Sequence, residues 1–364
     1  MITKEEVLAA LSHVQEPDLG KDLVTLNMIR DVEIEGKKIS FMVVLTTPAC
    51  PLKELIERDC INAIKEHVNA EADVIVKMEA NVNSNRKDSK AVLPGVKNII
   101  MVASGKGGVG KSTVSVNLAL GLASEGAKVG ILDADIYGPS IHIMLGIRNE
   151  KPMMTEVEGK GMIVPIEAHG VKAMSIGILV DERQAMIWRG PMASSALKQF
   201  VSDVLWGELD YLVIDLPPGT GDVHLTLVQA VPVTGAVIVS TPQAVAAADA
   251  KKAIMMFKQP QINIPILGMV ENMAYFTPAE LPENKYYIFG KGGAKQMAEQ
   301  FELPYLGEVP LVQGIREGGD KGVPAILDMT NPARNVFVDI AQSVARNVSI
   351  RNANLEPTKV VHVV

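Results

Sequence analysis

The sequence predicts a doubly wound α/β domain with a mostly parallel sheet, preceded by a small α+β domain. From residue 96 onward, short apolar runs alternate with helical periods, whereas the first 80 residues mix helices with a strand pair. Strands that are apolar on both faces and joined by helices form parallel sheets covered on two sides. The intervening stretch, NVNSNRKDSKAVLPG, is polar and typical of a linker. We therefore divide the chain into residues 1–80, a linker over 81–95 and a large domain over 96–364.

The first 80 residues have the pattern of a compact α+β unit. Glu35 and Gly36 stand between two alternating apolar segments, which is a hairpin signal. We expect helices over residues 4–14 and 51–68, and strands over residues 28–34, 38–45 and 72–78.

The large domain begins with an apolar run and continues with four more. We expect strands over residues 98–104, 128–133, 211–215, 235–241 and 266–271. Residues 225–248 carry no charge over a length that can span a bilayer, but Pro232 and Pro242 interrupt them. This segment therefore indicates a helix end, a buried strand and two turns, and we expect no membrane association.

Composition and charge narrow the class of protein. The chain has 364 residues, of which 48% are hydrophobic and 21% charged, as in folded enzymes. Its formal net charge of -7 disfavours nucleic acid as a partner, because the surface repels a polyanion. Cys50 and Cys60 are the only cysteines, and Glu5 and Glu6 stand where a signal peptide needs basic residues. We therefore expect a cytoplasmic protein.

The strongest motif is GKGGVGKST, which follows the strand at residues 98–104 and opens a helix over 112–124. This is a Walker A sequence in the context that it requires, and a glycine-rich turn without a ligand is the alternative. Its glycines let backbone N–H groups surround phosphates, Lys111 reaches the terminal phosphates, and Ser112 holds Mg²⁺. The predicted nucleotide-binding residues are Gly105, Gly107, Gly108, Val109, Gly110, Lys111, Ser112 and Thr113.

Two acidic residues follow neighbouring predicted strands. Asp215 ends the run over 211–215 and precedes LPPGTGD, which indicates a Walker B aspartate for Mg²⁺ or a residue that caps the loop. Gly219 can present its N–H to the γ-phosphate. Asp135, in DADIYGPS, lies where ligands bind in such sheets and can orient the attacking water, or it can simply form the turn. Asp133 is expected to be structural or to lie close to Mg²⁺.

Lys106 is a second lysine in the loop, which the binding of one nucleotide does not require. GKGGVGKST, DADIYGPS and DLPPGTGD together resemble the deviant-Walker-A ATPases, which include MinD, ParA and the nitrogenase iron protein. With IWRGPM at 187–192 and VENM at 270–273, the chain is most similar to the Mrp/ApbC iron–sulfur cluster carrier branch. The resemblance implies an ATP-hydrolysing homodimer in which Lys106 reaches the partner's nucleotide, and in which Asn272 and Pro310 hold adenine. The predicted catalytic residues are Lys106, Lys111 and Asp135.

The first 80 residues resemble the small SufT-like domain that accompanies such ATPases, on EPDLG at 16–20 and TPACP at 47–51. We expect Cys50 to cap a helix that begins at Pro51, where the helix dipole favours thiolate. It is then either a ligand of iron or a structural thiol. Cys60 falls in an apolar helical row and is expected in the core.

The chain departs from the carrier branch in one respect. Relatives usually place a Cys-x-x-Cys pair in the segment that here spans residues 274–290, but residues 61–364 contain no cysteine. A thiolate-ligated cluster shared by two ATPase domains cannot form as it does there. The leading hypothesis is an ATPase that binds iron–sulfur clusters or transfers them to apo client proteins. The alternative is a MinD- or ParA-like scaffold switched by ATP, and the missing cysteines disfavour a reductase.

Overall fold

The structure is a computed structural model that describes residues 2–87, 92–180, 190–278 and 280–361. These residues group into two compact units, Met1–Asn83 with Ala345–Leu355, and Ser84–Val344 with Glu356–Val364. Residues 345–355, which the sequence analysis assigned to the large domain, group here with the first unit. The other predicted boundaries remain predictions. Residues 187–189 of the IWRGPM segment lie outside the described part.

The first unit is a three-stranded sheet covered by two helices. Thr3 and Glu6 form a capping box that starts α1 (Lys4–Leu11). Strand β3 (Ile29–Glu35) pairs antiparallel with β4 (Lys38–Leu45), which pairs parallel with β5 (Asp73–Ala80). Strands β1 (Gln15–Glu16) and β2 (Lys21–Asp22) form a short separate ladder, and α2 runs over Lys53–His67. Cys60 is fully buried in the core of this unit, as expected.

The second unit contains an eight-stranded sheet in the order β10-β11-β7-β12-β6-β13-β14-β15. All neighbouring strands are parallel except β10 and β11. The strands are β6 (Val96–Ala103), β7 (Val129–Asp133), β10 (Ile166–Ala168), β11 (Val171–Ser175), β12 (Leu209–Asp215), β13 (Gly235–Ser240), β14 (Ile266–Asn272) and β15 (Tyr305–Val309). A separate hairpin consists of β8 (Met154–Val157) and β9 (Lys160–Ile163).

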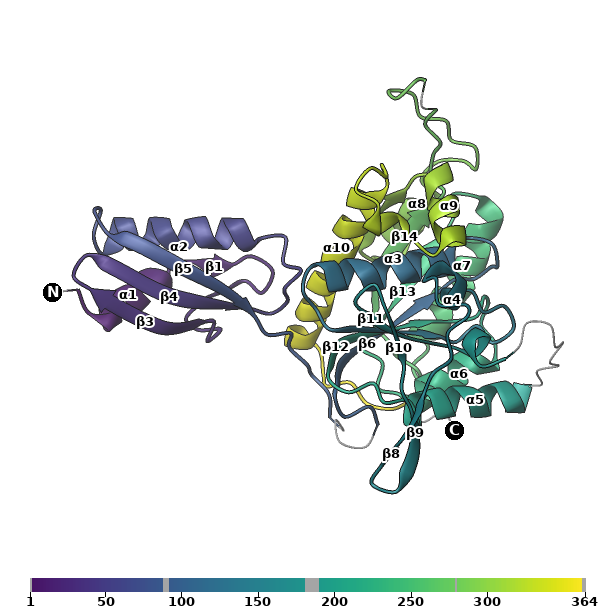
Figure 1. Cartoon of the computed structure of the whole chain (residues 1–364). Helices are drawn as coiled ribbons and strands as arrows, with labels where there is room; N and C mark the ends of the chain where they lie inside the picture. Colours follow the sequence, from purple (N-terminus) through teal and green to yellow (C-terminus); the bar gives the residue numbers. More distant parts are fainter. Residues whose placement is uncertain (1, 88–91, 181–189, 279, 362–364) are drawn as a thin grey trace. The chain divides into compact units, whose positions relative to one another are not determined.

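Helices cover both faces of this sheet. Figure 1 shows α3 on one side of the strands and α5 with α6 on the other. The helices are α3 (Lys111–Ser124), α4 (Ile141–Met144), α5 (Gly190–Ser202), α6 (Asp222–Ala230), α7 (Ala244–Lys258), α8 (Gly293–Gln300), α9 (Gln313–Lys321) and α10 (Arg334–Asn354). The predicted doubly wound, mostly parallel α/β domain preceded by a small α+β domain is therefore confirmed.

The parallel register sets the position of the site. Asp215 at the end of β12 pairs with Asp133 of β7 and with Val102 of β6. The ends of the three strands therefore meet at one edge, from which the loop to α3 leaves. In the part of the chain that the structure describes, no helix is long and apolar enough to cross a membrane.

Candidate nucleotide-binding site

The loop between β6 and α3 is shaped by its glycines. Gly108 and Gly110 have φ angles of +80° and +79°, which residues with a side chain rarely adopt. A Cβ atom on Gly105 would lie 2.0 Å from a backbone atom of α7, and one on Gly110 would lie 2.1 Å from Nδ2 of Asn272. Because α3 begins at Lys111, its first backbone N–H groups have no partner within the helix. These features are those of a loop that binds phosphate.

A buried ion pair lies beside this loop. Lys111 Nζ is 2.8 Å from Asp215 Oδ1, and the two side chains are 6% and 0% exposed. Asp215 also accepts hydrogen bonds from Ser112 Oγ and Ser115 Oγ, each at 2.6 Å. Hydroxyl and carboxylate oxygens are the ligands that Mg²⁺ prefers, so Ser112 and Asp215 have the donor chemistry for the predicted ion.

Asp133 supports the loop that follows β7. It accepts four hydrogen bonds, from the backbone N–H groups of Asp135, Ser140 and Ile141 and from Ser175 Oγ, at 3.2, 3.0, 3.2 and 2.9 Å. Burial and the charge of Asp215 raise the pKa of Asp133 to about 7. The carboxyl group therefore fixes the backbone from which Asp135 projects.

Asp135 lines a cavity of about 200 Å³ together with the phosphate-binding loop. Its Oδ1 accepts the Gly138 N–H at 3.2 Å. Partial burial raises the pKa of the Asp135 carboxyl, and the charge of Lys111 opposes that shift. The structure thus brings Asp135, Lys106, Lys111 and Ser112 to the walls of one cavity.

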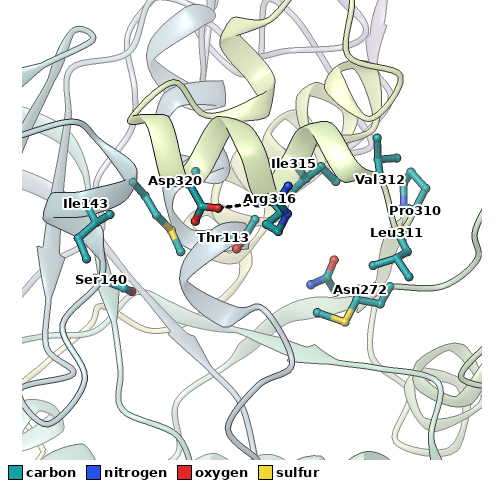
Figure 2. A pocket seen from close by; sticks show the side chains of 13 residues that line it. Thr113, Ser140, Ile143, Asn272, Pro310, Leu311, Val312, Ile315, Arg316 and Asp320 are labelled. Atoms are coloured by element: carbon teal, nitrogen blue, oxygen red, sulfur yellow. Dashed lines mark hydrogen bonds and ion pairs between the residues drawn. The ribbon is translucent and has the colours of Figure 1, made fainter.

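A second cavity, of about 380 Å³, adjoins the first and shares Thr113, Ser140 and Met144 with it. Figure 2 shows α9 along one side of this cavity, with Arg316 and Asp320 joined by an ion pair of 2.9 Å. Asn272 also lines the cavity, and its Nδ2 donates to the Val109 carbonyl at 2.8 Å. The apolar part of the wall consists of Ile143, Met144, Met273, Pro310, Leu311, Val312 and Ile315. An apolar cavity with a few polar groups beside a phosphate-binding loop suits a nucleotide base.

Two predicted residues lie at the edge of the phosphate site. The Lys106 side chain is exposed, and its backbone carbonyl accepts from Ser104 Oγ at 2.9 Å. Gly219 has a φ of +92°, and its N–H donates to the Ser104 carbonyl at 2.9 Å. The Gly219 N–H therefore already has a protein partner in this structure.

The expectation that Cys50 caps a helix is wrong. Helix α2 begins at Lys53, and its N-cap is Leu52, so the thiol lies in the preceding turn. Burial raises the pKa of the half-buried Cys50 thiol, and the charges of Glu16 and Asp18 raise it further. A hydrogen bond from the Leu52 backbone opposes this shift, but burial dominates, so the thiol form is favoured over thiolate.

Within the described ranges, no group of three or more His, Cys, Asp or Glu side chains is arranged to hold a metal ion. Cys50 thus has no such set of neighbours in the first unit.

Three residues near the phosphate-binding loop were not predicted from the sequence. Arg316 and Asp320 line the second cavity, and Ser115 Oγ donates a hydrogen bond to Asp215. A signal for Ser115 exists, because it lies one helical turn after Ser112 on the face toward β12.

Comparison with known proteins supports the fold and the P-loop ATPase class. The family model described as "NUBPL iron-transfer P-loop NTPase" matches residues 95–345, and the one described as "Iron-sulfur cluster assembly protein" matches residues 4–78. A nucleotide-binding protein from Archaeoglobus fulgidus, solved with ADP, is 39% identical with a TM-score of 0.58, over 68% of this chain and 95% of that one.

Several relatives align with most of this chain. The "Iron-sulfur cluster carrier protein" of Synechocystis sp. is 48% identical over 96% of this chain and 99% of the relative. The protein of the same name from Escherichia coli K12 is 46% identical over 88% of this chain and 85% of the relative. These matches confirm the resemblance and the ATPase class expected from the sequence. The chain is therefore a P-loop ATPase that belongs to the iron–sulfur cluster carrier protein family.

Proposed function

We propose that this protein binds ATP with Mg²⁺ and hydrolyses it to control the transfer of iron–sulfur clusters to apo client proteins. The observation that carries the nucleotide part is the buried contact of Lys111 and Ser112 with Asp215 at the end of the phosphate-binding loop. The relatives named iron–sulfur cluster carrier proteins support the cluster part.

The residues of the phosphate site have different proposed roles. The loop N–H groups surround the phosphates, and Lys111 turns from Asp215 toward them. Ser112 and Asp215 would hold Mg²⁺, which neutralises charge on the β- and γ-phosphates when bound. The loop residues proposed to bind the phosphates are Gly105, Gly107, Gly108, Val109, Gly110, Lys111, Ser112 and Thr113, and all of them except Gly105 and Val109 line the phosphate cavity. Asn272 and Pro310 line the neighbouring cavity, where they would contact the base.

Hydrolysis needs two further residues. Asp135 is only partly buried and lines the phosphate cavity, so it can orient the attacking water. Lys106 is exposed, which leaves it available to the nucleotide of a second subunit in a homodimer. An arginine-finger-like cation of this kind stabilises the charge that develops during phosphoryl transfer.

The cluster is cargo and must use few ligands from this chain. Cys60 is fully buried, and burial raises its pKa to about 12, so Cys50 is the accessible thiol. Two copies of Cys50 in a dimer supply half of the about four thiolates that a cluster usually takes. We expect the client or a small thiol to complete the set, and we expect binding to be labile.

The small number of accessible cysteine ligands suggests a second candidate function. A scaffold that ATP switches between two states needs no metal ligands, and the described residues offer no group of three. Iron binding separates the two candidates.

The test is anaerobic reconstitution of the full chain with iron and sulfide, followed by iron counting and an absorbance spectrum. Cys50→Ser is the variant and Cys60→Ser is the matched control. Iron that is lost in Cys50→Ser and kept in Cys60→Ser supports the carrier function. Stoichiometric iron in Cys50→Ser contradicts the assignment of the ligand, and absence of iron in the wild type favours the scaffold.

A further inference from the structure

The rings of His13 and His67 lie against each other on the surface of the first unit. Their centroids are 4.5 Å apart, and the ring planes are tilted by 33°. Both side chains are exposed, and among the described residues neither ring has a hydrogen bond or an ion pair. An imidazole in its neutral form has one unprotonated nitrogen, so the pair offers two such nitrogens to a ligand.

The other histidines in the described part of the chain do not offer this. His142 and His224 are only 2% and 1% exposed. His169 is exposed, but its Nε2 lies 2.9 Å from the carbonyl oxygen of Gly322. His13 and His67 are therefore the described imidazoles that an ion in solution can reach without competing with a protein partner.

The histidine pair lies where two helices end. His67 is the last residue of α2, and His13 follows Ser12, the C-cap of α1. The last carbonyl groups of a helix give its C-terminus a partial negative charge, which favours a nearby cation. The charge of the whole unit has the same sign, because the unit contains 15 acidic and 11 basic residues. Local and overall charge thus both favour a cation at the pair.

The separation of the two rings suits one shared metal ion. An imidazole nitrogen binds such an ion at about 2.1 Å, so two rings on one ion have centroids about 4.5–5 Å apart for bond angles of about 90–110°. The observed distance of 4.5 Å between the centroids lies in this range. Because both side chains are exposed, rotation about their χ angles can turn one nitrogen of each ring toward the ion without moving the backbone.

We propose that His13 and His67 bind a divalent transition-metal ion of the class that prefers imidazole, namely Zn²⁺, Ni²⁺ or Cu²⁺. Two protein ligands leave at least two coordination positions to water or to a side chain of another protein. The bound ion is therefore exchangeable, unlike an ion enclosed by four protein ligands. The site uses neither Cys50 nor the phosphate-binding loop, so it is independent of the proposed function.

The experiment is a calorimetric titration of the tag-free full chain with Ni²⁺, at about pH 7.5, which lies above the ordinary pKa of an imidazole. Cys50→Ser serves as the parent protein, because an accessible thiol also binds Ni²⁺, whereas Cys60 is fully buried. Excess Mg²⁺ occupies the oxygen ligands of the nucleotide site. His13→Gln and His67→Gln each remove one imidazole and keep a polar side chain. His169→Gln is the matched control, because it removes an exposed imidazole outside the pair.

We expect the parent protein to bind a single Ni²⁺ ion per chain. His13→Gln and His67→Gln should each raise the dissociation constant more than about tenfold, because loss of a metal ligand outweighs loss of a group that merely orients one. His169→Gln should leave the dissociation constant unchanged. Thermal unfolding without metal verifies that the variants are folded, and exposed substitutions of this kind should change it little.

Three results would overturn the proposal. The first is an absence of Ni²⁺ binding in the parent protein. The second is an unchanged dissociation constant in either His13→Gln or His67→Gln, since the two rings would then not share the ion. The third is an equal loss of affinity in His169→Gln, which would make the binding nonspecific. The titration contains neither ATP nor iron and sulfide, so its outcome is distinct from that of the test of the proposed function.

Discussion

Lys111 and Lys106 belong to one phosphate-binding loop, but they differ in burial and therefore in their proposed roles. Lys111 is buried against Asp215, whereas Lys106 is exposed. Removal of the buried lysine should lower the free energy of unfolding more than removal of the exposed one, because it leaves the buried Asp215 carboxylate without its cation.

We therefore predict that Lys111→Ala abolishes ATP binding in a calorimetric titration and also lowers the free energy of unfolding by about 3 kcal/mol. The second effect arises from the Asp215 carboxylate, which loses its partner at 2.8 Å. Lys106→Ala is the control, with near-native affinity and stability but reduced turnover. Near-native ATP affinity in Lys111→Ala would refute the role of this loop.

The buried side chain of His224, in α6, makes the free energy of unfolding decrease as the pH falls. Its pKa is about 4 in the folded state against 6.5 ordinarily, so between these values the unfolded state binds more protons. Stability is therefore fully present above pH 6.5 and falls as the pH drops toward 4. We predict that wild type loses about 2 kcal/mol more unfolding free energy than His224→Gln between pH 7 and pH 4.5. Urea denaturation at both pH values measures the difference, and equal losses would contradict it.

Among the elements, five central strands and the phosphate-binding loop were predictable from sequence, whereas β10, β11 and β15 were not. Strands β6, β7, β12, β13 and β14 are almost entirely buried and mostly apolar, a pattern that can be recognised in the sequence. Strand β10 has three residues and alternates in burial, and β15 is partly exposed, so neither carries that signal. The cap of α2 also escaped prediction, because the turn at Cys50 delays the helix to Lys53.

The phosphate-binding loop offers a matched pair of glycines for testing its geometry. Gly108 and Gly110 have nearly the same φ, but only a Cβ on Gly110 would collide with Asn272. We predict that Gly108→Ala costs about 1 kcal/mol of unfolding free energy and Gly110→Ala about 3 kcal/mol. Denaturation without nucleotide measures both. Gly110→Ala in an Asn272→Ala background should recover part of the difference, and equal costs for the two single variants would exclude the collision.

At the scale of the whole molecule, the proposed homodimer places residues of two subunits in each active site. A Lys106→Ala subunit retains its own Asp135, and an Asp135→Ala subunit retains Lys106. If Lys106 acts on the partner's nucleotide, a mixed dimer of these two variants has one complete site.

We predict that each variant alone is nearly inactive and that an equal mixture recovers about a quarter of the wild-type turnover, since half of the dimers are mixed and half of their sites are complete. The measurement is ATP turnover after co-refolding or co-expression. An equal mixture as inactive as either variant alone would assign Lys106 to its own subunit.

The hydrogen bond from Asn272 to the Val109 carbonyl joins the base cavity to the loop that holds the phosphates. A base that fits the cavity leaves this bond in place, whereas one that displaces the Asn272 amide also disturbs the backbone before Lys111. Selection between adenine and guanine nucleotides would then depend on the rate of hydrolysis as well as on the binding affinity. If a guanine base displaces the Asn272 amide, we expect GTP to be hydrolysed more slowly than ATP even where both bind.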